Sequence, residues 1–256
     1  MSDTPFICPG HPEQAPDIDA VVIKDKTVYY CSDKTFLKGS PCLKCPCRKM
    51  SNYEVAKRRT QKEFARYDHG AIAAKLDLIY DDEFMYLEFL GRDYRVNRHS
   101  GVMEWKDKEG TLHEGDFNDV MTILDILCYS KEGAAPAGEY QVMHSLATLQ
   151  GGTTFAGEGS FTRHEKLFDE HTEAFKQALE KIGGIPGGKG DVSRKIRIFK
   201  DLWTIVEFWR SDEDFPASLE FMVDKKTLDY MHYETVWYMV SALIAQIRDQ
   251  MEKDGV

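Results

Sequence analysis

The sequence predicts an α+β body, an antiparallel sheet covered by helices, preceded by a small cysteine-rich head. Two observations carry this expectation. β-rich runs separated by turns alternate with segments of helical periodicity, and five of the six cysteines fall within the first 47 residues. The expected sheet segments are 84–105 and 194–223, and the expected covering helices are 117–129, 165–182 and 232–253. We therefore expect two domains, a head over residues 1–50 and a body over residues 51–256.

Composition and charge exclude several classes of protein. With 42% hydrophobic and 12% aromatic residues, the 256-residue chain can bury a core and is not of the disordered class. Its net charge of −10 disfavours nucleic acid and anionic membranes as partners. No secretory signal is visible, and the most apolar run, 236–245, is about half the roughly 20 residues of a membrane span. We therefore expect a cytoplasmic protein, in which clustered thiols bind metal or do redox work more often than they form disulfides.

The head contains turns and a hairpin that can bring its cysteines together. Cys8 and His11 lie on a sharp Pro-Gly turn, and the runs 20–23 and 27–31 indicate a hairpin that delivers Cys31 at its end. A proline-bearing loop then carries three more cysteines, Cys42, Cys45 and Cys47. About 50 residues with one hairpin cannot build a self-sufficient core, and a metal is the usual staple for so small a unit.

Tetrahedral zinc is the preferred interpretation of these cysteines. A pair of cysteines three residues apart suits zinc because both sulfurs can chelate one ion. The expected ligands are Cys8, Cys31, Cys42 and Cys45, with Cys47 or His11 as substitutes. An iron–sulfur cluster also needs four ligands and is the second interpretation, and free or redox-active thiols are the third. The head is thus expected to be zinc-ribbon-like or an iron–sulfur module.

The body begins with two expected helices, over 51–68 and 70–79. Ser51 is a candidate N-cap, and Glu54 three residues later completes a capping-box pattern. Basic residues outnumber acidic ones on the first helix. A zinc-headed adaptor for nucleic acid or protein is therefore one alternative function.

A β-meander and an amphipathic helix follow. The runs 83–90 and 93–96 flank a glycine-containing turn and predict a hairpin, which 102–105 extends. Helical spacing over 117–129 places Cys128 on the apolar face, so we expect this cysteine in the core rather than at a metal.

The stretch 136–159 is glycine-rich, and we expect an irregular surface loop rather than a phosphate cradle, because no phosphate-binding fingerprint is present. Such a long loop is often a binding element. Gly151 and Gly152 within it, and the flanking His144 and His164, are therefore the candidate cofactor-binding residues. An enzyme with a pocket under the 136–164 loop is a second alternative function.

The last third predicts a long amphipathic helix, a set of strands and a final helix. His171 falls within the apolar stripe of the 165–182 helix, and we expect it in the core. The expected strands are 194–199, 202–210 and 218–223, and the final helix is 231–253. Three acids at 212–214 are expected on an exposed hairpin tip.

A set of motifs is spread over residues 52–247: 52–54, 89–96, 136–139, the Gly151-Gly152 loop, 182–184, 190–191, 202–209, 212–217 and 229–230. On these motifs the chain resembles an uncharacterised family, domain of unknown function 3786, found mainly in anaerobic bacteria and archaea. A typical relative has proline before the last helix, near the position of His232 here. Some members of that family look to be fused to a four-cysteine iron–sulfur domain of the kind seen in corrinoid proteins of one-carbon metabolism. The resemblance implies a redox or corrinoid-linked setting, with a corrinoid as a possible cofactor.

Together these observations favour a metal-binding accessory protein. It would bind an unidentified cofactor or protein partner in anaerobic redox or corrinoid-linked one-carbon metabolism. The sequence contains no G-x-S-x-G elbow, no H-E-x-x-H and no dinucleotide fingerprint, so it assigns no catalytic residues.

Overall fold

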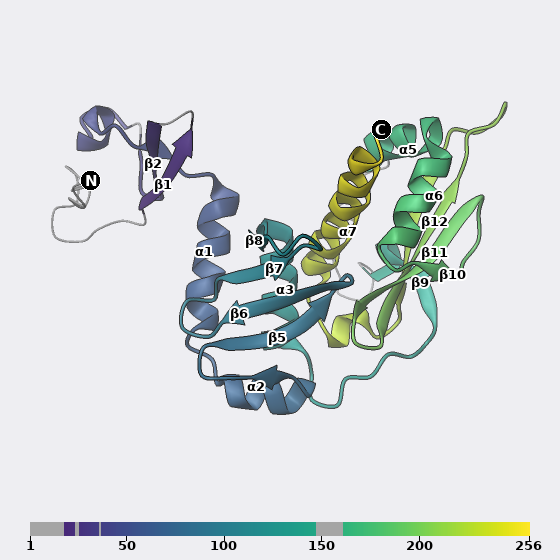
Figure 1. Ribbon diagram of the computed structural model, residues 1–256, viewed down its shortest axis with the longest axis horizontal. Coiled ribbons are helices and arrows are strands. Elements are labelled where there is room, and N and C mark those ends of the chain that lie inside the picture. The colour runs from purple at the N-terminus through teal and green to yellow at the C-terminus, as the bar shows by residue number, and fades with distance from the viewer. Residues whose placement is uncertain (1–17, 24–25, 36, 147–160) are drawn as a thin grey trace. The chain divides into compact units, whose positions relative to one another are not determined.

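The structure is a computed structural model that describes residues 18–23, 26–35, 37–146 and 161–256 (Figure 1). The chain divides into two compact units, residues 1–59 and 60–256. None of the helices within the described ranges combines the length and hydropathy that a membrane span requires.

The first unit contains a small sheet. Its elements are β1 (Ile18–Ile23), β2 (Lys26–Cys31), the 3-10 helix η1 (Pro41–Lys44) and β3 (Arg48–Lys49). β1 and β2 pair antiparallel, which is the hairpin expected from the sequence, and β3 pairs parallel to β2. Cys31 therefore lies beside Lys49, at the end of the loop that carries the other three described head cysteines.

The second unit contains two five-stranded antiparallel sheets. The first is a meander of β4 (Ile79–Tyr80), β5 (Phe84–Phe89), β6 (Arg92–Asn97), β7 (Met103–Lys106) and β8 (Leu112–Glu114). The second has the order β10 (Ile185–Pro186), β11 (Val192–Phe199), β12 (Leu202–Trp209), β13 (Ser218–Asp224) and β9 (Tyr140–Val142). The α+β class is confirmed, but the sequence led us to expect one sheet rather than two. In the first sheet each strand pairs with the next one in sequence, whereas in the second sheet β9 pairs with β13 at the edge. The two sheets meet where the Leu90 N–H donates to the Ile198 carbonyl at 3.0 Å.

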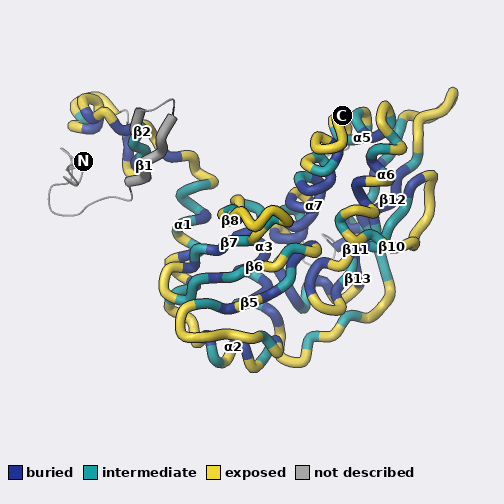
Figure 2. Tube along the Cα trace, viewed as in Figure 1, coloured by how far each residue is buried: buried dark blue, intermediate teal, exposed yellow. Residues whose placement is uncertain are grey.

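Six α-helices and two short 3-10 helices complete the described fold. They are α1 (Asn52–Phe64), α2 (His69–Leu76), α3 (Phe117–Tyr129), η2 (Met143–Ser145), α5 (Thr162–Glu170), α6 (Thr172–Lys181), η3 (Thr227–Asp229) and α7 (Tyr233–Lys253). In Figure 1 the long helix α7 runs between α3 and α6, and it contacts both. Figure 2 shows that buried positions follow α7 and the central strands, and these side chains form one core.

Sequence periodicity explains why these strands form. Along β5 the buried side chains are Met85, Leu87 and Phe89, at the period of two that places alternate residues on one face. The β5–β6 turn has positive φ at both Leu90 (50°) and Gly91 (72°), as a two-residue hairpin turn of this twist requires. The predicted hairpin is therefore confirmed, with its turn where the glycine indicated.

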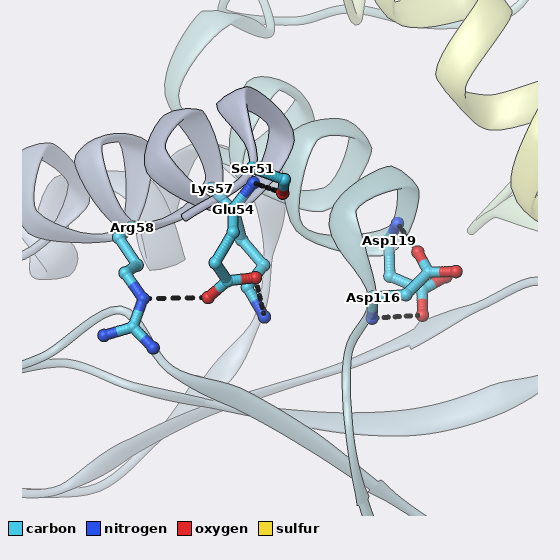
Figure 3. A network of polar contacts seen from close by, with 6 residues as sticks. All are labelled: Ser51, Glu54, Lys57, Arg58, Asp116 and Asp119. Atoms are coloured by element: carbon cyan, nitrogen blue, oxygen red, sulfur yellow. Dashed lines mark hydrogen bonds and ion pairs between the residues drawn. The ribbon is translucent and has the colours of Figure 1, made fainter. Parts of the chain in front are cut away.

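Figure 3 draws two helix starts, one at Ser51, where the sequence predicted an N-cap, and one at Asp116, for which no cap was predicted. In α1 the Ser51 Oγ accepts the Glu54 N–H at 3.1 Å, and Glu54 Oε1 accepts from the Arg58 Nε at 2.8 Å. In α3 the Asp116 Oδ1 accepts the Asp119 N–H at 2.9 Å, while Asp119 Oδ2 accepts the Asp116 N–H at 3.2 Å. This reciprocal pair satisfies two donors at the helix start that would otherwise lack partners.

Two expectations for the region after residue 136 are wrong. The 165–182 helix is two helices, α5 and α6, because the backbone breaks at His171 (φ −129°, ψ 44°), and His171 is exposed rather than in the core. Part of the expected irregular loop is strand β9, which pairs with β13. The pairing is fixed by Asp224 at the end of β13, whose carboxylate accepts the backbone N–H groups of Ala137 and Gly138 at 2.9 and 2.7 Å.

Candidate functional site

The described cysteines of the head are all buried. Cys31, Cys45 and Cys47 form one cluster, with Tyr29 packed against it, and Cys42 is buried nearby in sequence on η1. No disulfide joins these four cysteines to one another. The remaining expected ligands, Cys8 and His11, lie outside the described residues.

The loop that carries these cysteines is held by local hydrogen bonds. Ser40 caps η1, because its Oγ accepts the Cys42 N–H at 3.1 Å, and the Cys45 N–H donates to the Cys42 carbonyl at 3.2 Å. Lys34 is buried, and its Nζ donates to the carbonyls of Cys45, at 2.8 Å, and Cys42. Hydrogen bonds from the Thr35 backbone and the Ser40 side chain lower the pKa of the Cys42 thiol. The loop therefore presents sulfur atoms from a fixed backbone.

Within the described ranges, no group of three or more His, Cys, Asp and Glu side chains is arranged to hold a metal ion. The expected zinc or cluster site is therefore not assembled from the described residues by themselves. A site with four ligands therefore requires at least two ligands from outside them, and Cys8 and His11 are the candidates that the sequence supplies. Free or redox thiols remain an alternative.

The histidines that flank the glycine-rich loop face aromatic side chains. The His144 ring lies edge-on to Trp237, with centroids 5.2 Å apart, and 6.4 Å from Phe161. The His164 backbone N–H donates to the Phe161 carbonyl at 2.7 Å, and its ring lies 6.2 Å from Phe168. Burial, together with the charges of nearby arginines, lowers the pKa of His164. Gly151 and Gly152 lie outside the described residues, so the expected pocket beneath this loop stays a prediction.

A cleft that the sequence did not indicate lies in the second unit, between α3, the start of α7 and the residues around Phe64. Its volume is about 300 Å³. The lining residues are Thr60, Glu63, Phe64, Tyr67, Met121, Leu124, Asp125, Cys128, His232, Glu234, Thr235 and Tyr238. They combine apolar side chains with carboxylates and hydroxyls, the mixture that is typical of small-molecule sites.

An Asp–His pair lies in this cleft. Asp125 is on α3, and His232 is the residue before α7. Asp125 Oδ2 accepts the His232 backbone N–H at 2.8 Å, and Asp125 Oδ1 lies 2.7 Å from the His232 Nδ1. The His232 ring also packs on Tyr129, with centroids 3.7 Å apart. The two residues are 107 positions apart, so periodicity along the chain gave no signal for their contact.

Cys128 lies at the edge of the core rather than inside it. The side chain is half-buried, packs against the core and lines the cleft. Burial raises the pKa of the Cys128 thiol to about 12. The thiol is therefore protonated at neutral pH, and it is not an activated nucleophile of the Asp–His pair.

Residues 68–246 match the family model described as "Domain of unknown function (DUF3786)". No curated protein and no solved structure matches the chain significantly. The matched segment contains most of the second unit, including the Asp125–His232 pair, and leaves the cysteine-rich head outside it. Because the match covers well over half of the sequence, the chain belongs to this family.

Proposed function

We propose that this member of the DUF3786 family is a metal-binding accessory protein. Its head holds a zinc ion, or as second choice an iron–sulfur cluster. The family domain binds a cofactor or a protein partner, in anaerobic redox or corrinoid-linked one-carbon metabolism. The support for that setting is the family resemblance.

The observation that carries the metal proposal is the composition of the head's interior. In its described part, the hydrophobic cluster consists of Cys31, Cys45 and Cys47, with Tyr29 beside it. Three thiol side chains bury little apolar area, so they contribute little of the free energy needed to order a unit of this size. Bonds from sulfur to a metal would supply that free energy, as they do in small metal-stapled domains.

The donor chemistry fits the proposal. Zinc and iron–sulfur clusters are both held by thiolates, and the described part of the head supplies four buried thiols, Cys31 at the end of β2 and Cys42, Cys45 and Cys47 on the following loop. Cys8 and His11 would supply the ligands that the described residues by themselves do not bring together. The loop's hydrogen bonds to Ser40 and Lys34 hold the backbone while the sulfurs bind.

The test is metal analysis with an absorption spectrum of the full chain purified without oxygen. We expect about one zinc per chain and no visible colour, whereas brown protein containing iron and sulfide would select the cluster. Cys45→Ser should lose most of the metal. Cys128→Ser, which alters a body cysteine, should keep it.

Two results would overturn the proposal. One is a chain that binds neither metal while all its thiols titrate freely with a thiol reagent. The other is a Cys45→Ser variant with the metal content of the unmodified chain. The first result would favour redox-active thiols instead.

A further inference from the structure

The contact with Asp125 fixes the tautomer of the neutral His232 ring. A carboxylate is a hydrogen-bond acceptor only, so the proton in this contact belongs to Nδ1. In the neutral ring Nε2 then carries a lone pair and accepts hydrogen bonds. Packing on Tyr129 holds the ring plane, and the backbone N–H contact to Asp125 fixes the residue itself. The result is an imidazole with one tautomer and one orientation.

Anchoring α7 would not require this ring contact. The hydrogen bond from the His232 backbone N–H to Asp125 already ties the start of α7 to α3, and any residue except proline could make it. The side chain is 56% exposed and lines the cleft, so Nε2 is within reach of a small molecule there. The ring is therefore not needed for the joint between the helices and is accessible from the cleft.

The cleft walls define the chemistry of that molecule. Phe64, Met121 and Leu124 supply apolar surface. Glu234 and Asp125 supply carboxylates, and Glu234 is positioned because its Oε1 accepts from the Tyr238 hydroxyl at 2.8 Å. None of the described side chains that line the cleft is a lysine or an arginine. A cleft with carboxylates in its wall attracts cations and repels phosphates and carboxylates.

We propose that this cleft is a binding site for a small organic cation, a primary ammonium group attached to an apolar body. The ammonium N–H donates to the His232 Nε2, and Glu234 balances its charge. The apolar body packs on Phe64 and Leu124. A cleft of about 300 Å³ is at the small end of ligand sites, so the occupant is a metabolite-sized molecule and not a peptide. This site is separate from the metal proposed for the head, and each can fail without the other.

The test compares three probes that share a benzene ring and differ in charge. They are benzylamine, which is a cation at neutral pH, benzyl alcohol, which is neutral, and benzoate, which is an anion. Each is titrated to about 10 mM into the full chain while the ring nitrogens of the histidines are followed by ¹⁵N NMR. We expect benzylamine to shift the His232 nitrogens saturably, benzyl alcohol to bind roughly fivefold more weakly, and benzoate to cause no shift.

Variants separate the site from unspecific binding. Glu234→Gln keeps an oxygen for Tyr238 but removes the charge, and should weaken benzylamine binding by roughly fivefold. His232→Ala should weaken it by about tenfold, measured by calorimetry. His99→Ala alters an exposed histidine on the turn before β7 and should change nothing. The proposal is overturned if benzoate binds as tightly as benzylamine, if no probe shifts His232, or if Glu234→Gln binds benzylamine like the unmodified chain.

Discussion

Replacing Asp224 by alanine should destabilise the second unit more than any surface change. The side chain is fully buried at the end of β13. Its Oδ1 accepts the N–H groups of Ala137 and Lys226, at 2.9 and 2.8 Å, and its Oδ2 accepts the Gly138 N–H at 2.7 Å. Alanine leaves all three donors without this acceptor, and it releases the segment that leads into the edge strand β9.

The magnitude follows from the chemistry of these bonds. A hydrogen bond to a charged group contributes about 1.5–3 kcal/mol, and the contributions of three bonds to one carboxylate are not additive. Part of the total offsets the cost of burying the carboxylate. We therefore expect Asp224→Ala to lower the free energy of unfolding by about 3–5 kcal/mol. Asp224→Asn keeps one oxygen and places an NH₂ against a donor, so we expect a loss of about 1.5–3 kcal/mol.

Urea unfolding followed by tryptophan fluorescence is the appropriate assay. All four tryptophans, Trp105, Trp203, Trp209 and Trp237, lie in the second unit, so the signal reports the unfolding of that unit. The midpoint should fall in the order unmodified chain, Asn variant, Ala variant. Asp214→Asn, on the exposed tip after β12, is the matched control and should leave the midpoint unchanged. If Asp224→Ala unfolds at the same urea concentration as this control, the three hydrogen bonds do not stabilise the fold.

Three further changes have defined outcomes. Burial raises the pKa of Asp119 to about 6, so the folded chain holds this proton more tightly than the unfolded chain does. The stability that this group contributes is therefore fully present below pH about 4 and is lost as the pH rises to about 6. The free energy of unfolding of Asp119→Asn should therefore rise by about 2–3 kcal/mol relative to that of the unmodified chain as the pH goes from 4 to 7. A difference in urea midpoints that does not change with pH would refute this. Gly101→Ala should lower the thermal midpoint far more than Gly110→Ala. Both glycines have positive φ, but only at residue 101 would a Cβ lie 2.2 Å from the Gln61 carbonyl oxygen. Equal midpoints for the two variants would contradict this close approach. His171→Ala should leave the thermal midpoint unchanged, because the side chain is exposed where α5 ends. A large drop in the midpoint would mean that His171 lies in the core, as the periodicity of the sequence predicted.

Local patterns predicted the elements whose causes are local. Helix α3 has the bounds that helical spacing gave, 117–129, and Asp116 and Asp119 close its start through bonds three residues apart. The β5–β6 hairpin turns at Gly91 because a glycine tolerates the positive φ there. Where the cause is tertiary, the same patterns failed. The apolar stripe expected on a single 165–182 helix runs without a break through His171. The backbone nevertheless changes direction at His171, and the segment forms two helices, α5 and α6.

The sequence alone determined three things: the clustering of cysteines in the head, the strand and helix content, and the family to which the chain belongs. Each of them depends on residues near one another in the chain or on a pattern of motifs. Only the tertiary structure decided that the strands form two sheets, and that Asp125 meets His232 across 107 residues in a cleft. The physical reason is that a side chain's alternation or spacing records which face of its own element is buried. It does not record which distant element covers that face.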